Sequence, residues 1–215
     1  MKYFHLNKIP IENYNVIGFD MDGTLYSERM FITQIYIKIS QYLALYSYRK
    51  PSGIYDWMIN RWNYKGSSYP FIFSEAIERF CILNDKKIIE GCLHIYRNTP
   101  FKIDLHQNII DLLDQFSGKK EVFLVSDGHF ELQKRKFTSL RLNRWFLNEN
   151  VVFTGRWGSN YYKPNVESIK YVSCLRDRDE SVLYFGDRDM DEQFAKNAGF
   201  DFVKVEKFNE FWEVN

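Results

Sequence analysis

The sequence of 215 residues predicts an α/β fold, in which a Rossmann-like, doubly wound parallel sheet carries an inserted all-helical subdomain. Three observations lead to this prediction. Short apolar runs recur along the chain and end in polar residues or glycine, helical segments separate most of these runs, and one long interval has helical periodicity without a convincing strand. Strands that alternate with helices are typical of parallel sheets covered on both faces.

The predicted strands are short apolar runs. Each is rich in β-branched or aromatic residues and lacks strict alternation with polar ones, as expected of strands buried on both faces. Each of the first four runs is followed directly by polar residues or glycine, which places these residues at the carboxyl end of a strand. The five predicted strands are 16–19, 122–125, 151–153, 182–185 and 202–205.

Two helices are predicted between these strands. Apolar residues of 104–117 recur at helical spacing, and Gly118 is a suitable residue just beyond a helix end. A second helix is predicted over 165–175, after Lys163-Pro164, because proline is common at helix starts. Its apolar stripe consists of Val166, Ile169, Val172 and Leu175.

The interval 26–100 is too long for a crossover between two strands, so we expect it to form a separate helical subdomain. The core domain is therefore predicted to be discontinuous, with residues 1–25 and 101–215 on either side. Three amphipathic stripes support the helical assignment of the insert. They consist of Ile32, Ile35, Tyr36, Ile39, Leu43 and Leu45, of Phe73, Ile77, Phe80 and Cys81, and of Ile88, Ile89, Cys92 and Ile95.

Composition excludes several classes of function. A net charge of +1 gives no overall field for nucleic acid or an anionic membrane, and no apolar run reaches the roughly 18 residues that span a bilayer. The first residues lack the apolar segment of a secretion signal. Cysteines 81, 92 and 174 are odd in number and show no CxxC spacing, so we expect no disulfide framework and a cytoplasmic location.

Acidic residues follow two of the predicted strands. Asp20 and Asp22 come directly after the first strand, and Asp187, Asp189 and Asp191 follow the strand at 182–185. Ligands of open α/β sheets bind beyond the carboxyl ends of the strands. Because like charges about 4 Å apart repel by about 4 kcal/mol at an effective dielectric constant of 20, carboxylates that converge there need a cation. Mg²⁺, which prefers oxygen ligands, is the expected one.

Two further strand ends supply groups that suit an anion. Ser126 offers a hydroxyl group, and the turn Ser126-Asp127-Gly128 can present backbone N–H groups. Lys163 offers an ammonium group ahead of the helix predicted at 165–175. Each of these features alone is common in proteins without any such function, so their combination carries the prediction.

The order of these groups, DxDGT, then Ser, then Lys-Pro, then GDxxxD, resembles the haloacid dehalogenase-like hydrolase superfamily. The resemblance covers 16–25 and 120–205, and it includes Gln133 and Lys136 after the second motif. The insert 26–100 lies where that family carries a helical cap subdomain of type C1. The resemblance also implies the phosphatase branch, because Asp22 stands at a position where dehalogenases usually lack aspartate.

The resemblance implies a role for each motif residue. Asp20 would be the nucleophile that forms an aspartyl-phosphate, and Asp22 would protonate the leaving oxygen and then activate water. Ser126 and Lys163 would hold the phosphoryl oxygens. The implied substrate-binding residues are Gly23, Thr24, Asp127 and Gly128. The implied Mg²⁺ ligands are Asp20, the carbonyl group of Met21, Asp22, Asp187 and Asp191.

The sequence departs from the family pattern at two places. Asp127 stands where asparagine is common, which adds a negative charge near an anion site unless its side chain points away. Asp189 is an additional acid in the fourth motif, so the pattern leaves open whether Asp189 or Asp191 lies nearer the metal.

The function that we expect from these features is that of a Mg²⁺-dependent phosphatase for a small phosphorylated metabolite, active as a monomer or homodimer. A phosphomutase of the same fold, like beta-phosphoglucomutase, is the alternative. A non-catalytic family member or a receiver-like binding module fits less well, because the nucleophile of receivers lies on a later strand and this chain keeps all the motif residues.

Overall fold

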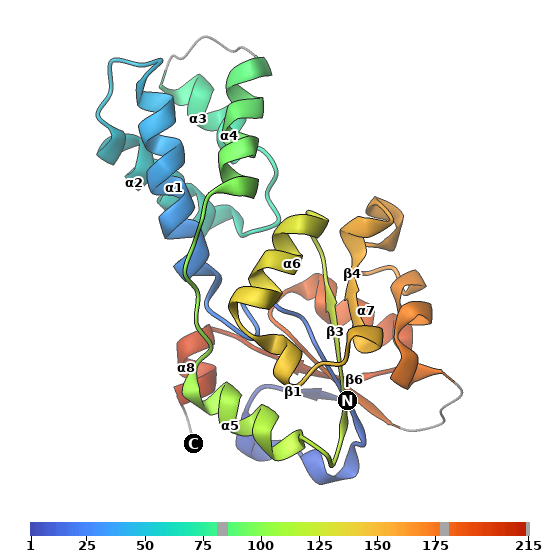
Figure 1. The fold of residues 1–215 in the computed structure, drawn as a ribbon. Helices are drawn as coiled ribbons and strands as arrows, with labels where there is room; N and C mark the ends of the chain where they lie inside the picture. The colour runs from blue at the N-terminus through green and yellow to red at the C-terminus, as the bar shows by residue number, and fades with distance from the viewer. Residues whose placement is uncertain (81–85, 177–180, 214–215) are drawn as a thin grey trace. The chain divides into compact units, whose positions relative to one another are not determined.

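The computed structural model describes residues 1–80, 86–176 and 181–213 of the chain (Figure 1). The chain divides into two compact units. Unit 1 consists of Met1–Glu28 and Ile103–Asn215, and unit 2 consists of Arg29–Lys102.

Unit 1 is built on a six-stranded sheet with the strand order β1-β6-β5-β2-β3-β4, in which all paired strands are parallel. From β2 the order proceeds through β3 and β4 on one side and through β5 and β6 on the other, so the sheet is doubly wound. The strands are β1 (Lys2–Tyr3), β2 (Val16–Phe19), β3 (Glu121–Ser126), β4 (Val151–Phe153), β5 (Val182–Gly186) and β6 (Asp201–Lys204).

This sheet confirms the predicted fold class and all five predicted strands, within one residue at each end. The edge strand β1 was missed, because two residues are too few to produce an apolar pattern. It pairs with β6 through Lys2 and Phe202.

The centre of the sheet is buried, and every residue of β2 is buried. Gly18 occupies the middle of β2 because the Phe123 ring of the neighbouring strand packs there. A Cβ atom on Gly18 would lie 2.2 Å from that ring. This close packing holds the carboxyl ends of β2 and β3 side by side, with β5 on the other side of β2.

The α-helices of unit 1 connect or follow these strands. They are α5 (Gln107–Phe116), α6 (Phe130–Ser139), α7 (Asp189–Ala198) and α8 (Phe208–Glu213). Helix α5 confirms the prediction for 104–117, and Gly118 beyond its end has a φ of 71°. Short 3₁₀ helices span Leu6–Lys8, Ile11–Asn13, Leu142–Arg144, Asn148–Asn150, Thr154–Arg156, Ser159–Tyr161, Glu167–Tyr171 and Ser173–Leu175.

The helix predicted over 165–175 is wrong as an α-helix. The segment forms two 3₁₀ helices, Glu167–Tyr171 and Ser173–Leu175. Its apolar residues are spaced strictly by three, which is the repeat of a 3₁₀ helix and not the 3.6 residues of an α-helix. The stripe still packs inward, since Val172 belongs to the buried core and Val166, Ile169 and Leu175 pack against that core.

Within the described residues of unit 2, all the regular elements are helices. Its helices are α1 (Glu28–Ala44), α2 (Pro51–Lys65), α3 (Ile72–Arg79) and α4 (Lys86–Asn98). The predicted stripes lie on α1, α3 and α4, except that Phe80 caps the end of α3 and that Leu45 lies beyond the end of α1, where it is 78% exposed. Cys81 lies outside the described residues, and Cys92 and Cys174 are buried free thiols.

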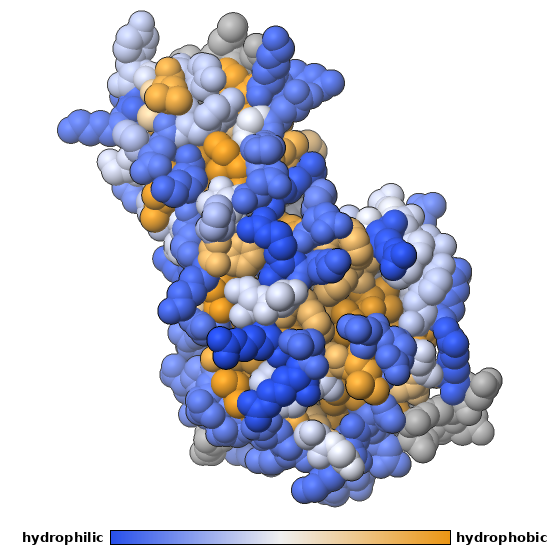
Figure 2. All heavy atoms as spheres, viewed as in Figure 1, coloured by the Kyte–Doolittle hydropathy of each residue, from blue (hydrophilic) through white to orange (hydrophobic). Residues whose placement is uncertain are grey.

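In the space-filling view, hydrophilic side chains cover much of the visible face of each unit, and apolar side chains appear between them (Figure 2). Among the described helices, none has the length and apolar character required to cross a bilayer.

Candidate active site

The carboxyl end of β2 positions the first acidic motif. The backbone N–H of Asp20 donates to Phe185 O at 2.8 Å, which continues the ladder with β5 and fixes Asp20 at the sheet end. The chain then turns, with Leu25 N donating to Met21 O at 3.0 Å and Gly23 N donating to Tyr26 O at 3.1 Å. This turn closes at Gly23, whose φ of 76° is costly for any residue with a side chain.

Lys163 joins two of the acidic groups in the interior of unit 1. Its ammonium group lies 2.5 Å from Asp20 Oδ1 and 2.5 Å from Asp191 Oδ1, and all three side chains are at most 1% exposed. Burial opposes the charge of Lys163, but the two carboxylates outweigh it and hold the lysine pKa well above its usual value. A buried ammonium group between two carboxylates is therefore charged throughout the physiological pH range.

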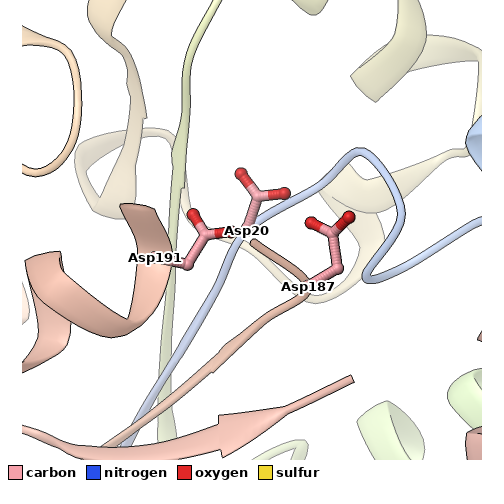
Figure 3. Close-up of side chains that lie close together, drawn as sticks. All are labelled: Asp20, Asp187 and Asp191. Atoms are coloured by element: carbon pink, nitrogen blue, oxygen red, sulfur yellow. The ribbon is translucent and has the colours of Figure 1, made fainter. Parts of the chain in front are cut away.

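The carboxylates of Asp20, Asp187 and Asp191 converge at one point (Figure 3). Each offers an oxygen atom, and these atoms all lie within 4.8 Å of one another. They come from the end of β2, from the residue after β5 and from the first turn of α7. Asp189, in contrast, points away to Lys204, and its side chain is 99% exposed. Of the two acids that the sequence left open, Asp191 therefore lies in this group and Asp189 lies outside it.

The donor set of this cluster fits a divalent cation. Asp20 Oδ2 and Asp187 Oδ1 are buried and accept no hydrogen bond from any described residue. Burial and the neighbouring charge of Asp20 raise the pKa of Asp187 well above its usual value, and burial raises that of Asp20 to about 7 despite Lys163. Buried carboxylate oxygens without donors are costly unless a proton or a metal ion satisfies them.

Asp22 lies apart from these three carboxylates. Lys136 Nζ donates to its Oδ1 at 2.6 Å, Gln133 Nε2 donates to its Oδ2 at 2.6 Å, and the Tyr26 hydroxyl also donates to Oδ1. Burial opposes ionisation, but Lys136 and the other donors lower the pKa of Asp22 below its usual value. Asp22 is thus an ionised carboxylate whose two oxygens already have partners.

The turn after β3 brings the second motif to the same end of the sheet. Ser126 is 1% exposed, and its hydroxyl oxygen accepts from Gln133 Nε2 at 2.8 Å, which connects it to Asp22 through one side chain. A Cβ atom on Gly155 would lie 1.9 Å from Gly128 O, so the segment after β4 can pass this turn only with glycine at 155.

The Asp127 carboxylate binds the segment that carries Lys163. Its Oδ1 accepts from Thr154 Oγ1 at 2.8 Å, and its Oδ2 accepts from the backbone N–H of Lys163 at 3.2 Å. Its Oδ1 also lies 3.3 Å from the same N–H, so the carboxylate offers Lys163 N two acceptor oxygens, whereas an asparagine would offer one.

The structure thus gathers Asp20, Ser126, Lys163, Asp187 and Asp191 at the carboxyl ends of the strands, with Asp22 next to Ser126 through Gln133. Met21 is fully buried, and its carbonyl oxygen accepts the N–H of Leu25 in the turn. Thr24 is also buried, and its carbonyl accepts from the indole N–H of Trp212 at 3.0 Å.

Sequence reasoning missed several side chains of this region. Tyr26, Tyr184 and Arg188 were not predicted as site residues, although Tyr184 lies 3.3 Å from the Lys163 ammonium group and donates to Val125 O. Arg188 offered a usable signal, because a cation among the acids of the Gly186–Asp191 motif is unexpected in a site for a metal ion alone. The two tyrosines lie in apolar runs that a buried strand or turn explains equally well.

Comparison with known proteins identifies a family match that covers most of the chain. Residues 17–205 match the profile of the family described as haloacid dehalogenase-like hydrolase. No match was found among curated proteins.

Solved structures share the fold at low sequence identity. A provisionally assigned phosphatase from Clostridium difficile has a TM-score of 0.64 and 20% identity, with 89% of this chain and 85% of that chain covered. A provisionally assigned beta-phosphoglucomutase from Thermotoga maritima has a TM-score of 0.62 and 17% identity, with 94% and 100% covered. A provisionally assigned hydrolase of the same superfamily from Bacillus subtilis, bound to magnesium, has a TM-score of 0.61 and 15% identity, with 89% and 87% covered.

Proposed function

Because this chain belongs to the haloacid dehalogenase-like hydrolase family, and is therefore an enzyme, we propose that it is a Mg²⁺-dependent phosphatase acting on a small phosphomonoester. The observation that carries the proposal is the cluster of Asp20, Asp187 and Asp191 around one point, with Lys163 bonded to two of them. Such a site combines carboxylates for a divalent cation with a fixed ammonium group for phosphoryl oxygens.

In this proposal Asp20 is the nucleophile. Its carboxylate attacks phosphorus, the bond to the ester oxygen breaks, and an aspartyl-phosphate forms on Asp20. The position of Asp20 is fixed by the β-ladder and by Lys163, so little freedom is lost when it attacks. Ser126 and Lys163 hold the phosphoryl oxygens and stabilise the charge that develops there.

Asp22 is the proposed proton carrier. In the ionised form described here it suits the second half of the reaction, in which it takes a proton from the water that attacks the aspartyl-phosphate. To protonate the leaving oxygen it must first release part of its bonding to Lys136 and Tyr26 and bind a proton. The three donors therefore favour the base form of Asp22 in the resting enzyme.

The proposed Mg²⁺ ligands are Asp20, Asp187 and Asp191, together with the carbonyl group of Met21 and with Asp22 as implied by the resemblance. The oxygens of Asp20 and Asp187 that lack donors support this assignment most directly. When bound, Mg²⁺ would neutralise negative charge on these carboxylates and on the substrate phosphate. We further propose that unit 2 acts as the substrate-selecting cap, that the enzyme is a monomer or homodimer, and that it works in the cytoplasm.

A phosphomutase is the second candidate. The structure of the provisionally assigned beta-phosphoglucomutase aligns over 94% of this chain, so the fold suits both reactions. The two functions differ in their products: a phosphatase releases inorganic phosphate, whereas a mutase converts one sugar phosphate into its isomer without release.

The test is a panel of phosphorylated metabolites assayed for phosphate release, with Mg²⁺ and with EDTA. We expect release in Mg²⁺, loss of release in EDTA, and near-complete loss in the Asp20→Asn variant. Asp111→Asn is the matched control, since Asp111 is an exposed carboxylate on α5 that bonds only to nearby Gln107 among the contacts described. Full activity of Asp20→Asn would contradict the proposal, and isomerisation without release would favour the mutase.

A further inference from the structure

Tyr184 borders the candidate site, in a position that the proposed function does not use. It belongs to β5, it is fully buried, and its hydroxyl oxygen lies 3.3 Å from Lys163 Nζ. The same hydroxyl lies 3.1 Å from Val125 O, near the end of β3 and next to Ser126 in the chain. One neutral side chain therefore joins the lysine of the site to the strand that carries Ser126.

The chemistry of the three groups fixes the direction of both hydrogen bonds. A carbonyl oxygen only accepts and an ammonium group only donates, so Tyr184 donates its one hydrogen to Val125 O and accepts one from Lys163. Burial raises the pKa of Tyr184 well above its usual value, so the hydroxyl keeps its hydrogen. The ring packs against Phe194 and Phe123, with centroids 5.2 Å and 6.0 Å away, which holds the hydroxyl in place.

The contact with Tyr184 completes the hydrogen bonding of the Lys163 ammonium group. An ammonium group has three hydrogens, and Lys163 has three acceptors. These are Asp20 Oδ1 and Asp191 Oδ1, each at 2.5 Å, and the Tyr184 hydroxyl at 3.3 Å. Each hydrogen therefore already has an acceptor, and a phosphoryl oxygen can bind Lys163 only in exchange for one of the three.

Tyr184 is the acceptor that Lys163 exchanges most easily. The bonds to the two carboxylates are short and charge-assisted, whereas the bond to the hydroxyl is long and its acceptor is neutral. When this bond is broken, Tyr184 keeps its own hydrogen bond to Val125 O, and only a lone pair loses its partner. A buried ammonium hydrogen without an acceptor costs more, since hydrogen bonds of charged groups are stronger.

We propose that Tyr184 is a positioning residue that accepts the third hydrogen of Lys163 in the free enzyme and releases this hydrogen to a phosphoryl oxygen. This inference rests on the proposed function and deepens it. Because the bond to Tyr184 is lost when a phosphate binds, Tyr184 lowers the affinity of the site for phosphate. The product orthophosphate consequently leaves more readily than it would from a lysine that had a hydrogen to spare.

The test compares orthophosphate binding and thermal unfolding in Tyr184→Phe and wild-type protein, both saturated with Mg²⁺. The variant keeps the ring and leaves one hydrogen of Lys163 without an acceptor until phosphate binds. We therefore expect calorimetry to show roughly tenfold tighter binding of orthophosphate, and the melting temperature without phosphate to fall by roughly 3–6 °C. Saturating orthophosphate should remove most of that fall, because Lys163 then has three acceptors in both proteins.

Tyr14→Phe is the matched control. Tyr14 is a buried tyrosine of the same unit, and its hydroxyl donates to Asp201 Oδ2 at 2.6 Å, at the first residue of β6. This variant should lower the melting temperature equally with and without orthophosphate, and should leave orthophosphate affinity unchanged. The inference is overturned if Tyr184→Phe binds orthophosphate as tightly as the wild type or more weakly, since a tyrosine that kept its bond to Lys163 in the bound state would not oppose phosphate binding.

A measurement on the wild type keeps the inference testable if Tyr184→Phe does not fold. In a crystal structure with Mg²⁺ and orthophosphate, a phosphate oxygen should lie within hydrogen-bond distance of Lys163 Nζ, and the Tyr184 hydroxyl should lie beyond that distance. The bond from Tyr184 to Val125 O should remain. A Tyr184 hydroxyl that still bonds to Lys163 beside the phosphate would overturn the inference.

The two proposals fail in different ways. If wild-type protein binds orthophosphate in Mg²⁺ but hydrolyses no phosphomonoester, the proposed function fails and the affinity of Tyr184→Phe still decides the role of Tyr184. If the wild type hydrolyses phosphomonoesters and Tyr184→Phe does not bind orthophosphate more tightly, only the inference fails. If the wild type neither binds orthophosphate nor hydrolyses phosphomonoesters, both are overturned.

Discussion

Each unit of this protein contains an arginine or lysine bonded to carboxylates, but the two groups differ in charge balance. In unit 2, Arg61 pairs with Glu75 through two 2.6 Å bonds, and Tyr69 donates to the same carboxylate. In unit 1, Lys163 faces both Asp20 and Asp191, and Asp187 adds a further carboxylate.

The two groups differ in whether every carboxylate oxygen has a hydrogen-bond donor. Both oxygens of Glu75 have donors, and Arg61 lowers the pKa of Glu75 to about 2. This carboxylate therefore needs no further ligand. Asp20 and Asp187 each keep a buried oxygen without a donor among the described residues. Since natural proteins rarely leave buried polar atoms unsatisfied, we expect the group in unit 1 to be the one that binds a ligand.

Surface composition separates the units in the same way. Most of the exposed large apolar side chains among the described residues belong to unit 2, namely Met30, Ile37, Leu45, Tyr46, Tyr48, Tyr64 and Phe71, whereas unit 1 contributes Met1, Phe4 and Leu147. Under the proposed function, these exposed apolar and aromatic side chains of unit 2 are the candidates for selection among substrates.

Removal of the central cation should have the largest effect. Lys163→Met leaves Asp20 and Asp191 buried without the ammonium group that bonds to both, so we expect the free energy of unfolding to fall by about 3–5 kcal/mol. Arg61→Met breaks a pair whose side chains are 29% and 24% exposed, and should cost about 1 kcal/mol.

Urea denaturation of both variants in EDTA measures this difference. Mg²⁺ should recover part of the loss in Lys163→Met, since it replaces the missing positive charge, and none of the loss in Arg61→Met. Equal losses in the two variants would remove the distinction between the units.

The pH dependence of stability should also reveal the unbalanced group. Burial raises the pKa of Asp20 to about 7, so in the metal-free protein its folded form binds a proton that the unfolded form has already lost above about pH 4. Its contribution to stability is therefore present below about pH 4 and is lost as the pH rises through about 7. Glu75, with its lowered pKa, loses its contribution only in strong acid.

We therefore expect the melting temperature in EDTA to fall between about pH 4 and pH 7, and expect saturating Mg²⁺ to abolish that fall because it favours the ionised carboxylates. Asp20→Asn should weaken the slope in EDTA. A melting temperature that rises over this interval in EDTA would contradict the assignment of Asp20 as a buried carboxylate in need of a cation.

Gly23 in unit 1 and Gly53 in unit 2 allow the two units to be compared through substitutions of the backbone type. Gly23 has a φ of 76°, and a Cβ atom there would lie 2.4 Å from Asp187 Oδ2, so Gly23→Ala must displace that carboxylate. We expect roughly tenfold weaker Mg²⁺ binding, in the range found when the partners of metal ligands are changed. Gly53→Ala on α2 meets nothing within 4 Å and should stabilise unit 2 by about 0.5–1 kcal/mol.

Calorimetric Mg²⁺ titration and thermal unfolding of both variants test this prediction. Gly53→Ala should leave Mg²⁺ affinity unchanged. If Gly23→Ala bound Mg²⁺ as tightly as the wild type, Asp187 would have no part in the metal site.

The sequence predicted the sheet and the residues at its carboxyl ends because both depend on local signals. Short apolar runs end directly in Asp20, Ser126 and Asp187, and parallel pairing brings these ends together. Lys163 was also predicted as a site residue, but only from the resemblance to the family motifs, since a lysine before a proline is common.

The features that could not be predicted depend on the direction of side chains and on the difference between a repeat of 3 residues and one of 3.6. The bonds from Lys136 and Gln133 to Asp22 join positions more than 100 residues apart, and no local pattern encodes them. The 165–175 segment was assigned to the wrong helix type, because a stripe with a spacing of three was read as one with a spacing of 3.6. The acids at 189 and 191 were indistinguishable by sequence, since both follow the same strand.

The smallest expected effect concerns that last pair of acids. Asp189 pairs with Lys204 at 2.8 Å on the surface, as a balanced ion pair within unit 1, and Asp189→Asn should change Mg²⁺ affinity by less than about twofold. Asp191 is fully buried and bonded to Lys163. Asp191→Asn should therefore weaken Mg²⁺ binding by roughly tenfold or more. Calorimetry of both variants compares them directly. If Asp189→Asn had the larger effect, membership of the acidic cluster would not separate functional carboxylates from structural ones in this protein.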